Sequence, residues 1–470
     1  MAGLISLVLL GLLIAYIVLK PSRYNGHTTG KGVPVHILVL GDIGRSPRMT
    51  YHALSIAKHG GKVKLIGYLG MYSSVHTRQS HSPTPHIETS PHPDILTNPN
   101  ITLIPLPTPP SRPPSVPFLL FAPIKVIFQI LHLSYLLLYL LPPSAWLLVQ
   151  NPPSIPTLAI ASLTSYLRNS HLIIDWHNYG WTILSSTKGP SHPFVSLSKI
   201  YETYLGRLGS HHLTVTNAMA RQLRAAPYSI PPHKPMITVH DRPAAIFQPI
   251  LSPNARNEAL DKIIFPSGRE YYRALVSGKM KLLVSSTSWT PDEDFSLLLS
   301  ALTMYAARPD AVPILALITG KGPQKEYYDD KIDALVKEGK LPNVRIATLF
   351  LPFEDYARLL ACADLGVCLH MSSSGVDLPM KVVDMFGAGL PVVAYGGYES
   401  FGELVKEGVN GRGFETGEEL AGVLGELLKP EGENELKHLK KGAVEEGRRR
   451  WDEEWDGTVG RLMGFVEESS

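Results

Sequence analysis

The sequence predicts an α/β protein with two doubly wound parallel sheets facing a cleft, preceded by an N-terminal transmembrane helix. Two series of apolar, β-rich runs alternate with helical stretches, one beginning at Val33 and the other at Lys281. Strands that alternate with helices are typical of parallel sheets. The third observation is an apolar run from Ala2 to Leu19, which is about as long as a helix that spans a bilayer. A chain of 470 residues suits two domains of ordinary size.

The composition favours membrane contact and gives no reason to expect a nucleic-acid partner. Hydrophobic residues make up 44% of the chain and the mean hydropathy is +0.04, which is apolar for a soluble protein. The 44 basic and 41 acidic residues are too evenly balanced for a nucleic-acid-binding surface. The two cysteines, Cys362 and Cys368, lie in a stretch predicted to be buried, so we expect a reducing compartment rather than a disulfide framework.

Residues 1–20 are predicted to be a single-pass anchor with the body of the protein in the cytosol. Lys20, Arg23 and Lys31 follow the apolar run, and basic residues beside a membrane segment tend to stay cytosolic. A cleaved signal peptide is the competing interpretation, but no small-residue cleavage box follows the run. A second apolar stretch, 116–148, is broken by prolines and polar residues. It is either an amphipathic helix of the first domain or a helix that lies on the membrane surface.

The alternating pattern divides the chain into successive parts. The first domain is predicted at 33–226, with a flexible insertion at 73–117 that is rich in proline, serine, threonine and histidine except for a short strand near Ile101. Residues 227–278 connect it to a second domain at 279–430. Residues 431–470 are predicted to form an exposed charged helix.

The turn GDIGRSPR follows the first strand of the first domain. Gly41 and Gly44 let the backbone approach a ligand, and Arg45 offers a cation near a helix N-terminus. We therefore expect these residues to contact an anionic ligand, the donor substrate inferred below. Asp42 is a candidate base. The alternative is a turn that only caps a helix.

The segment WHNYGW follows another strand of the same domain. Trp176, His177, Asn178 and Tyr179 combine aromatic rings with hydrogen-bonding groups, which suits contact with the sugar rings of an acceptor. The alternative is a packed aromatic cluster.

Two loops of the second domain also follow strands. Ser286, Thr287 and Ser288 offer hydroxyl groups near a helix start, and Lys321 of the GKG turn offers a cation, so both loops are predicted to bind a phosphate group of the donor. The alternatives are a capping loop and a surface turn.

The segment HMSSSGVDLPMKVVDMFGAG carries the most specific pattern. Ser373, Ser374 and Gly375 form a turn suited to a phosphate group, and Lys381 and Asp384 lie one helical turn apart on the same face. A departing nucleoside diphosphate needs a cation, and a carboxylate holds a ribose diol. The segment therefore predicts the donor site of an enzyme that uses a nucleotide sugar. A structural Lys–Asp pair is the alternative.

At these residues the chain resembles glycosyltransferases of the GT-B class, which have two Rossmann-like domains. More narrowly, it resembles the chitobiosyldiphosphodolichol beta-mannosyltransferase family. The resemblance runs from Val33 to about Val423 and rests on several blocks together, GDIGRSPRM, QNPPSIPTL, IDWHNYGWTIL, HDRPA, SSTSWTPDEDFSLLLSAL and HMSSSGVDLPMKVVDMFGAGLPV. It implies transfer of the first mannose from GDP-mannose to dolichyl-diphosphate-linked chitobiose, in a β-1,4 linkage, at the cytosolic face of the endoplasmic reticulum membrane.

The resemblance also assigns residues, with one departure. Asp384 stands where related GT-B enzymes have a glutamate, but the position of their earlier glutamate is Val376, with Asp377 the nearest carboxylate. This suits an inverting enzyme, which needs a general base near the acceptor hydroxyl. Asp42 is the first candidate base and His177 the second. Glu403, in GGYESFGELV, matches the acid of a loop that binds the donor.

No metal site and no tightly bound cofactor are predicted, because no Asp-x-Asp sits at a suitable strand end and no His/Cys cluster has ligand spacing. Lys381, Arg45 and helix N-termini are expected to stabilise the leaving GDP instead. The predicted partners are the lipid-linked chitobiose, the membrane and other transferases of the same pathway. Two alternatives stay open, a lipid-directed GT-B enzyme with another donor such as UDP-N-acetylglucosamine, and a membrane-tethered subunit without activity of its own.

Overall fold

The computed structural model describes residues 20–70, 92–263 and 269–467, so the predicted anchor and part of the predicted insertion lie outside the described residues. The chain divides into two compact units. The first contains the described residues of 1–214, 222–237 and 455–470, and the second contains 215–221 and 238–454. Each unit is built on its own sheet, which confirms the two α/β domains predicted from the sequence.

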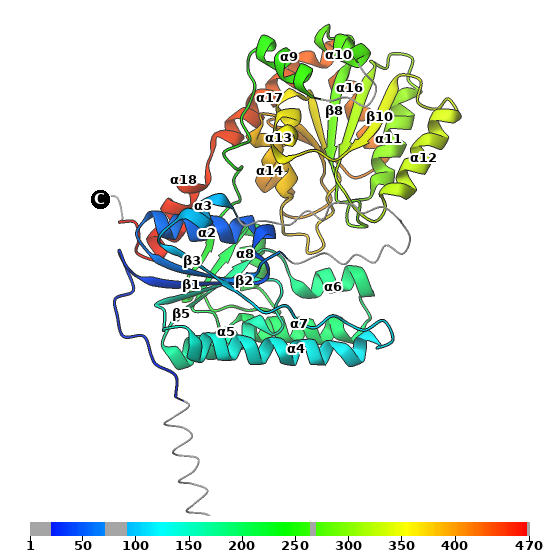
Figure 1. Ribbon diagram of the computed structural model, residues 1–470. Helices are drawn as coiled ribbons and strands as arrows, with labels where there is room; N and C mark the ends of the chain where they lie inside the picture. Colours follow the sequence, from blue (N-terminus) through cyan, green and yellow to red (C-terminus); the bar gives the residue numbers. More distant parts are fainter. Residues whose placement is uncertain (1–19, 71–91, 264–268, 468–470) are drawn as a thin grey trace, which may run out of the picture. The chain divides into compact units, whose positions relative to one another are not determined.

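The first unit has a seven-stranded sheet in the order β3-β2-β1-β4-β5-β6-β7. Its pairings from β3 through β6 are parallel. In Figure 1, α2 lies on one face of this sheet, and α4, α5 and α7 lie on the other. The strands are β1 (Pro34–Asp42), β2 (Lys62–Tyr68), β3 (Ile101–Pro105), β4 (Trp146–Asn151), β5 (His171–Trp176), β6 (His211–Thr214) and β7 (Met236–Thr238). The helices are η1 (Ile43–Arg45), α2 (Pro47–Lys58), α3 (Pro93–Thr97), α4 (Phe118–Tyr135), η2 (Leu136–Leu140), α5 (Thr157–Arg168), α6 (Gly180–Lys188) and α7 (Pro193–Gly206). Helix α8 (Asn217–Arg224) is divided between the units: its residues up to Arg221 belong to the second unit, and those from Gln222 belong to the first.

The central strands of this sheet are apolar on both faces. Val35, Ile37, Leu38 and Val39 of β1 have no exposed surface, as expected for a parallel strand covered by helices on both sides. The predicted insertion is partly ordered, because α3 precedes the predicted strand β3.

The second unit has a six-stranded sheet in the order β10-β9-β8-β11-β12-β13, and its pairings are parallel. One core cluster contains residues of α11, α12 and α16, and another contains residues of α9, α13 and α14. The strands are β8 (Lys281–Ser286), β9 (Ile314–Thr319), β10 (Val344–Leu349), β11 (Leu365–Cys368), β12 (Val392–Tyr395) and β13 (Gly411–Phe414). The helices are α9 (Pro253–Lys262), α10 (Arg269–Val276), α11 (Phe295–Ala306), α12 (Lys325–Lys337), α13 (Phe353–Cys362), α14 (Met380–Gly387), α15 (Phe401–Leu404), α16 (Gly417–Leu428), η3 (Pro430–Gly432) and α17 (Glu433–Arg448).

The boundaries of the units differ from the predicted domain boundaries. Residues 215–221, predicted in the first domain, belong to the second unit, and 227–237, predicted as part of the connection, belong to the first. Residues 238–278, predicted to be a connection, belong to the second unit and include α9 and α10. Residues 431–470 do not form one exposed helix: α17 packs into the second unit, α18 (Trp451–Trp455) and η4 (Asp456–Gly460) follow, and the chain returns to the first unit at Trp455. Their apolar residues explain the difference, because Leu439, Val459 and Met463 have no exposed surface.

Helix α4 exposes a row of apolar side chains on its outer face. Within the described residues, Leu120–Leu140 is the one helical stretch long and apolar enough to cross a membrane, and only 22% of its most apolar window is buried. The exposed residues Leu120, Ile124, Ile127, Leu131 and Tyr135 recur at helical spacing and are 54 to 67% exposed.

Candidate functional site

Each sheet has a point where the strand order reverses, and the predicted site loops lie at these points. The reversal falls between β1 and β4 in the first unit and between β8 and β11 in the second. In doubly wound sheets, ligands bind beyond the carboxyl ends of the strands at such a point. The predicted loops after β1, β5, β8 and β11 all emerge at the carboxyl ends of their strands.

Asp42, the first candidate base, ends β1 and caps the turn that follows. Its carboxylate accepts a hydrogen bond of 3.0 Å from the backbone N–H of Gly44, and its residue surface is 7% exposed. Gly44 and Arg45 are exposed, and Gly41 is half-buried. The Asp42 side chain therefore caps the turn, as the alternative interpretation expected. Gly44 and Arg45 stay candidates for contact with the donor.

His177, the second candidate base, lies beside a buried carboxylate that sequence reasoning did not identify. Its Nε2 is 2.8 Å from Oδ2 of Asp175, and its side chain is 22% exposed while that of Asp175 has no exposed surface. An ionised carboxylate only accepts hydrogen bonds, so the proton of neutral His177 is on Nε2 and Nδ1 carries the lone pair. This geometry resembles that of a base held in one orientation by an acid.

Asp175 is held ionised by an arginine. Burial favours the protonated acid, but the charge of Arg48 and the contacts with His177 and His52 outweigh it and hold the pKa of Asp175 well below its usual range. Arg48 Nε lies 2.9 Å from Oδ2, and Arg48 Nη2 lies 3.0 Å from Oδ1. A carboxylate at the end of an apolar strand was the signal in the sequence, because a buried charge needs a partner.

The rest of the WHNYGW segment packs into the first unit. Trp176 has no exposed surface and donates through Nε1 to His212 Nδ1 over 3.2 Å, and Tyr179 is 2% exposed with its ring stacked on Tyr228. The predicted acceptor contacts of Trp176 and Tyr179 do not fit this burial, and the packed-cluster alternative does. Asn178 is half-buried and accepts from the backbone N–H of Tyr179 over 2.7 Å.

A buried glutamate, Glu202, fixes the loop after β5. It accepts hydrogen bonds from the backbone N–H of Gly180 over 2.8 Å, from the Tyr228 hydroxyl over 2.6 Å and from the Ser154 hydroxyl. Burial raises its pKa. Glu202 thereby ties the loop that carries His177 to the loop after β4.

In the second unit, the loop after β8 is organised by a residue that the sequence analysis did not select. Glu293 is 3% exposed, and its Oε2 accepts from the Thr287 hydroxyl over 2.8 Å and from the Ser288 backbone N–H over 2.5 Å. Ser286 and Thr287 are buried, with the Ser286 hydroxyl 3.0 Å from that of Tyr356. Of the three predicted side chains, only that of Ser288 is exposed.

Lys381 pairs with Glu293 rather than with Asp384, so the structural Lys–Asp pair that was the alternative interpretation is not the pair observed. Its Nζ forms an ion pair with Oε1 of Glu293 and lies 3.4 Å from the Ser288 hydroxyl. Burial lowers the pKa of Lys381 to about 8, against the charge of Asp292, which raises it. Burial raises the pKa of Asp384 to about 7. Lys381 is thus held at the β8 loop by Glu293, and its predicted role in donor binding stays a prediction.

The serine loop after β11 is built around Asp377. The Ser372 hydroxyl donates to Asp377 and accepts from the Gly375 backbone N–H over 2.8 Å, while the Ser374 hydroxyl lies 3.4 Å from Oδ1 of Asp377. Burial alone would raise the pKa of Asp377, but His370, whose Nε2 is 3.2 Å from Oδ2, and the Ser372 hydroxyl lower it. Gly375 has φ +77°, a conformation that glycine adopts without strain. The loop is therefore preformed by its own contacts, with Ser373 beside them.

The GKG turn packs closely against the β8 loop. A Cβ at Gly320 or Gly322 would lie 1.7 Å from the backbone oxygen of Thr287 or of Ser288, so only glycine fits at either position. Lys321 is exposed, and its Nζ lies over the Phe350 ring, 3.9 Å from the centroid. These contacts fit the alternative interpretation, in which Lys321 belongs to a surface turn.

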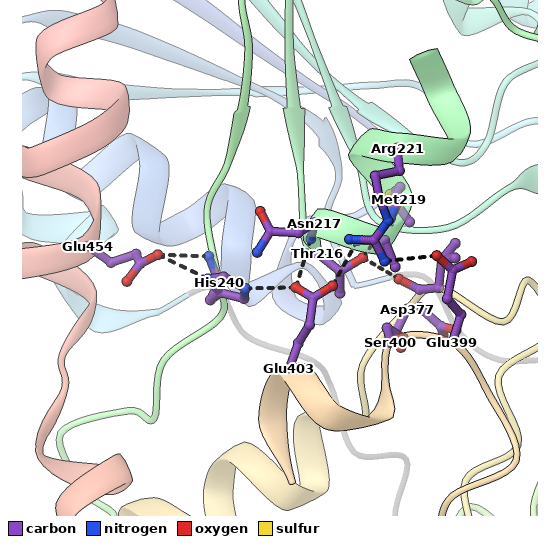
Figure 2. A network of polar contacts seen from close by, with 12 residues as sticks. Thr216, Asn217, Met219, Arg221, His240, Asp377, Glu399, Ser400, Glu403 and Glu454 are labelled. Carbon is purple, nitrogen blue, oxygen red and sulfur yellow. Dashed lines mark hydrogen bonds and ion pairs between the residues drawn. The ribbon is translucent and has the colours of Figure 1, made fainter. Parts of the chain in front are cut away.

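Glu403 contacts the protein itself instead of being free for the donor. Its two oxygens accept from the backbone N–H groups of Asn217 and Ala218, each over 2.7 Å, and His240 Nε2 is 3.1 Å from Oε2 (Figure 2). Carboxylates are favoured at a helix N-terminus, and α8 begins at Asn217. Sequence reasoning could not anticipate this competing partner, which is 186 residues away in the chain.

His240 joins Glu403 to Glu454 in the same network. Its Nδ1 lies 3.3 Å from Oε1 of Glu454, whose Oε2 receives Arg242 Nη2 at 2.7 Å. The hydrogen bond to Glu454 raises the pKa of His240, against burial, which lowers it. Contacts with His240 and Arg242 lower the pKa of Glu454 to about 2 although burial opposes this. The HDRPA block is thus held by three carboxylates, those of Glu403, Glu454 and Glu446, the last of which lies 2.9 Å from Arg242 Nη1.

This network predicts a pH-dependent stability. Because the pKa of His240 is raised on folding, its contribution is fully present below about pH 6.5 and is lost as the pH rises through the raised value. We expect His240→Gln to lower the free energy of unfolding by about 1.5–3 kcal/mol at pH 6 and by much less at pH 9. Denaturant unfolding at the two pH values measures the difference. His438→Gln, at an exposed position of α17, is the control, and an equal loss at both pH values would contradict the charged state of His240.

Among residues 20–70, 92–263 and 269–467, no group of three His, Cys, Asp or Glu side chains could hold a metal ion. The predicted independence from metals stays a prediction.

Comparison with known proteins identifies the group to which these features belong. Residues 279–429, which contain the β8 loop, the serine loop and Lys381, match the family Glycosyl transferases group 1. A chitobiosyldiphosphodolichol beta-mannosyltransferase of Arthroderma benhamiae is 49% identical over 397 residues, covering 82% of this chain and 88% of the relative. The protein of the same name from Homo sapiens is 39% identical over 450 residues and 90% of each chain.

Solved structures share the fold at low sequence identity. Sucrose-phosphate synthase from Thermosynechococcus elongatus superposes with a TM-score of 0.62 at 13% identity, covering 92% of this chain and 98% of that one. A glycosyltransferase from Rickettsia africae gives 0.55 at 14% identity, covering 93% and 96%. The predicted GT-B class is confirmed by these neighbours and by the two parallel sheets. By its identity to relatives over most of their length, the chain belongs to the chitobiosyldiphosphodolichol beta-mannosyltransferase family and is a glycosyltransferase.

Proposed function

We propose that the chain transfers the first mannose from GDP-mannose to dolichyl-diphosphate-linked chitobiose, with inversion to a β-1,4 linkage. The names of the curated relatives supply the acceptor and the sugar. The observation that carries the proposal is the position of Lys381, which is held by buried Glu293 beside the exposed Ser288 at the reversal point of the second sheet. A cation fixed in this way suits the diphosphate of a nucleotide sugar.

The second unit supplies the leaving-group half of the reaction. As the bond between the anomeric carbon and the diphosphate oxygen breaks, its electron pair goes to GDP and the negative charge on the diphosphate grows. Lys381 offsets this charge, and Ser288 with the backbone of the serine loop donates hydrogen bonds. Asp384, with its pKa near 7, stays the proposed contact of the ribose diol.

The first unit supplies the base. The acceptor hydroxyl oxygen attacks the anomeric carbon from the side opposite the diphosphate, and its proton passes to Nδ1 of His177. Asp175 stabilises the imidazolium that forms, as a buried acid does for a catalytic histidine. We place His177 ahead of Asp42 because Asp175 fixes the proton of His177 on Nε2, whereas Asp42 is occupied by the turn that it caps.

Donor choice is tested directly with detergent-purified full-length protein and phytanyl-diphosphate chitobiose. We expect radiolabel to enter the lipid from GDP-mannose and not from UDP-N-acetylglucosamine or UDP-glucose. If transfer from a UDP sugar is faster than transfer from GDP-mannose, that UDP sugar is the donor instead of GDP-mannose. No transfer without an added second protein would favour the non-catalytic subunit.

We further propose that the protein works at the cytosolic face of the endoplasmic reticulum membrane, with a single-pass anchor and with α4 lying on the lipid surface. A lipid-linked acceptor requires the enzyme to stay at the bilayer. Arg168 supports the arrangement: its Nη1 donates to the backbone oxygens of Leu137 and Leu141 at the end of η2, and its Nε donates to that of Ser22. The segment that follows the anchor is thereby tied to the end of the exposed apolar helix. Contact with other transferases of the pathway stays a prediction.

The contact of α4 with lipid is tested with an environment-sensitive fluorophore at Ile127→Cys. Cys362 and Cys368 are buried, so labelling under native conditions is directed to the new thiol. We expect the emission to shift to the blue and to be quenched by brominated lipids after reconstitution into vesicles. Tyr327→Cys, also exposed but in the second unit, is the control. Equal emission from the two labelled proteins would mean that α4 faces water.

A further inference from the structure

The buried carboxylate that orients His177 is also contacted from helix α2. Oδ2 of Asp175 lies 2.8 Å from His177 Nε2, 2.9 Å from Arg48 Nε and 3.3 Å from His52 Nε2. Arg48 and His52 are four residues apart and so lie on one face of α2. His52 and Asp175 have no exposed side-chain surface, so neither can exchange its protein partners for water.

The other ring nitrogen of His52 meets the C-terminal segment of the chain. Trp455 Nε1 donates to His52 Nδ1 over 2.9 Å, across 403 residues of sequence, and Trp455 has no exposed surface. An indole N–H can only donate, so Nδ1 of His52 must carry its lone pair. Burial lowers the pKa of His52, which keeps the ring neutral. Its single proton is therefore on Nε2, facing the carboxylate of Asp175.

Several further contacts hold Trp455 in this place. Its ring stacks on that of His59 at 5.7 Å between centroids, and Asp456 lies 2.8 Å from His59 Nε2. Farther along, the backbone oxygen of Gly464 accepts from Gly30 over 3.0 Å. The segment from Trp455 onward is thus a fixed part of the first unit, although it follows the second unit in the sequence.

We propose that Trp455 is a positioning residue for the reaction: through its indole N–H it sets the tautomer of His52, so that the Nε2–H of His52 faces Asp175 at 3.3 Å, and the resulting field at Asp175 acts on His177. This inference rests on His177 being the base, as argued above. The groups that face Asp175 from the elements around it are Arg48 and His52 of α2 and His177 after β5. Of these, His52 is the one contacted by Trp455 of the C-terminal segment.

The direction of the effect follows from the charges. In Trp455→Phe the ring volume is largely kept, but His52 Nδ1 loses its donor and the imidazole is no longer fixed toward Asp175. Asp175 then loses one neighbouring donor, and its charge holds a proton on His177 more strongly. We expect the acidic limb of the kcat profile to move to higher pH by about half a unit or more. At a pH well down this limb, where kcat changes about tenfold per pH unit, kcat should fall about threefold or more, while KM for GDP-mannose stays unchanged.

The matched control is Trp146→Phe, in the full-length protein. Trp146 is also buried in the first unit and donates through Nε1 to a backbone oxygen, that of Thr28, over 2.8 Å. It is the first residue of β4, whereas His177 follows the carboxyl end of the neighbouring parallel strand β5. The control therefore loses an equivalent indole hydrogen bond and should keep the pH profile of the wild type.

A second pair of variants keeps the test valid if Trp455→Phe folds poorly. The amide of His52→Gln can accept from Trp455 and donate to Asp175, so this variant should keep most of the profile, whereas His52→Leu should show the shift. The inference would be overturned if the acidic limb of the kcat profile stays unchanged in both Trp455→Phe and His52→Leu, or if it moves to lower pH. If His177→Ala is inactive while these variants match the wild type, the role of Trp455 is contradicted but His177 remains the base. If His177→Ala is active, both the assignment of His177 as the base and the role of Trp455 are contradicted.

Discussion

Replacing His177 by alanine is expected to lower kcat by about 10²–10⁴-fold, the usual contribution of a positioned general base. The acceptor hydroxyl must lose its proton as it attacks, and the side chain of alanine cannot take it. Binding of GDP-mannose should be unchanged, because the residues proposed to hold the diphosphate belong to the second unit. Single-turnover transfer and equilibrium binding of the donor separate the two effects.

The control for this experiment is His192→Ala. His192 also lies in the first unit, where its ring nitrogen caps α7 by accepting from the backbone N–H of Phe194. It should lose little activity. The same measurement on Asp42→Asn decides between the two candidate bases. If kcat falls by about 10²–10⁴-fold in Asp42→Asn while His177→Ala keeps its activity, Asp42 is the base.

Replacing Lys381 by alanine is expected to lower turnover by about tenfold or more, the scale of one lost contact to the charge that grows in the transition state. The variant should fold but with lower stability, because Glu293 loses its cation while it keeps its hydrogen bonds with Thr287 and Ser288. Thermal unfolding therefore has to be measured beside activity. Lys340→Ala, which breaks an exposed pair with Glu338, is the control and should have near-normal kcat.

The pKa of Lys381 gives this residue a second signature. Its pKa is lowered to about 8, so in the free enzyme the cation is lost as the pH rises through that value. We expect kcat/KM for GDP-mannose to fall above about pH 8, since this ratio reports groups of the free enzyme. In Lys381→Arg the guanidinium stays charged, and the alkaline limb should disappear even if the maximum is lower. An alkaline limb that is the same in both proteins would assign it to another group.

The fold and the loops of the site could be predicted because they depend on local patterns. Apolar runs alternating with helices define parallel sheets, and parallel strands end at one edge, so polar residues just after strands come together there. This placed Ser288 and His177 on loops at the ends of strands, and Lys381 in the segment after β11. For 116–148 the sequence left two interpretations open, because spacing alone does not tell which face of a helix is covered; the exposure of Leu120, Ile124 and Ile127 comes from the structure.

The partners of the charged side chains could not be predicted in the same way. Spacing along a helix offered Asp384 as a structural partner of Lys381 only as an alternative, and the buried carboxylate that holds Lys381 is Glu293, 88 residues earlier. Glu403 likewise faces the N-terminus of α8. A buried charge takes whichever opposite charge or N–H group the tertiary fold brings to it, and one sequence does not give that choice. Asp175 shows what a closer reading would have found, since a carboxylate inside an apolar strand always needs an explanation.

The anomeric configuration of the product tests the account most directly. Full-length protein is given radiolabelled GDP-mannose and phytanyl-diphosphate chitobiose, and the released trisaccharide is digested with β-mannosidase or with α-mannosidase. A single displacement with His177 as base and Lys381 on the leaving diphosphate predicts that β-mannosidase alone releases the label. Release by α-mannosidase would show retention of configuration and contradict the account.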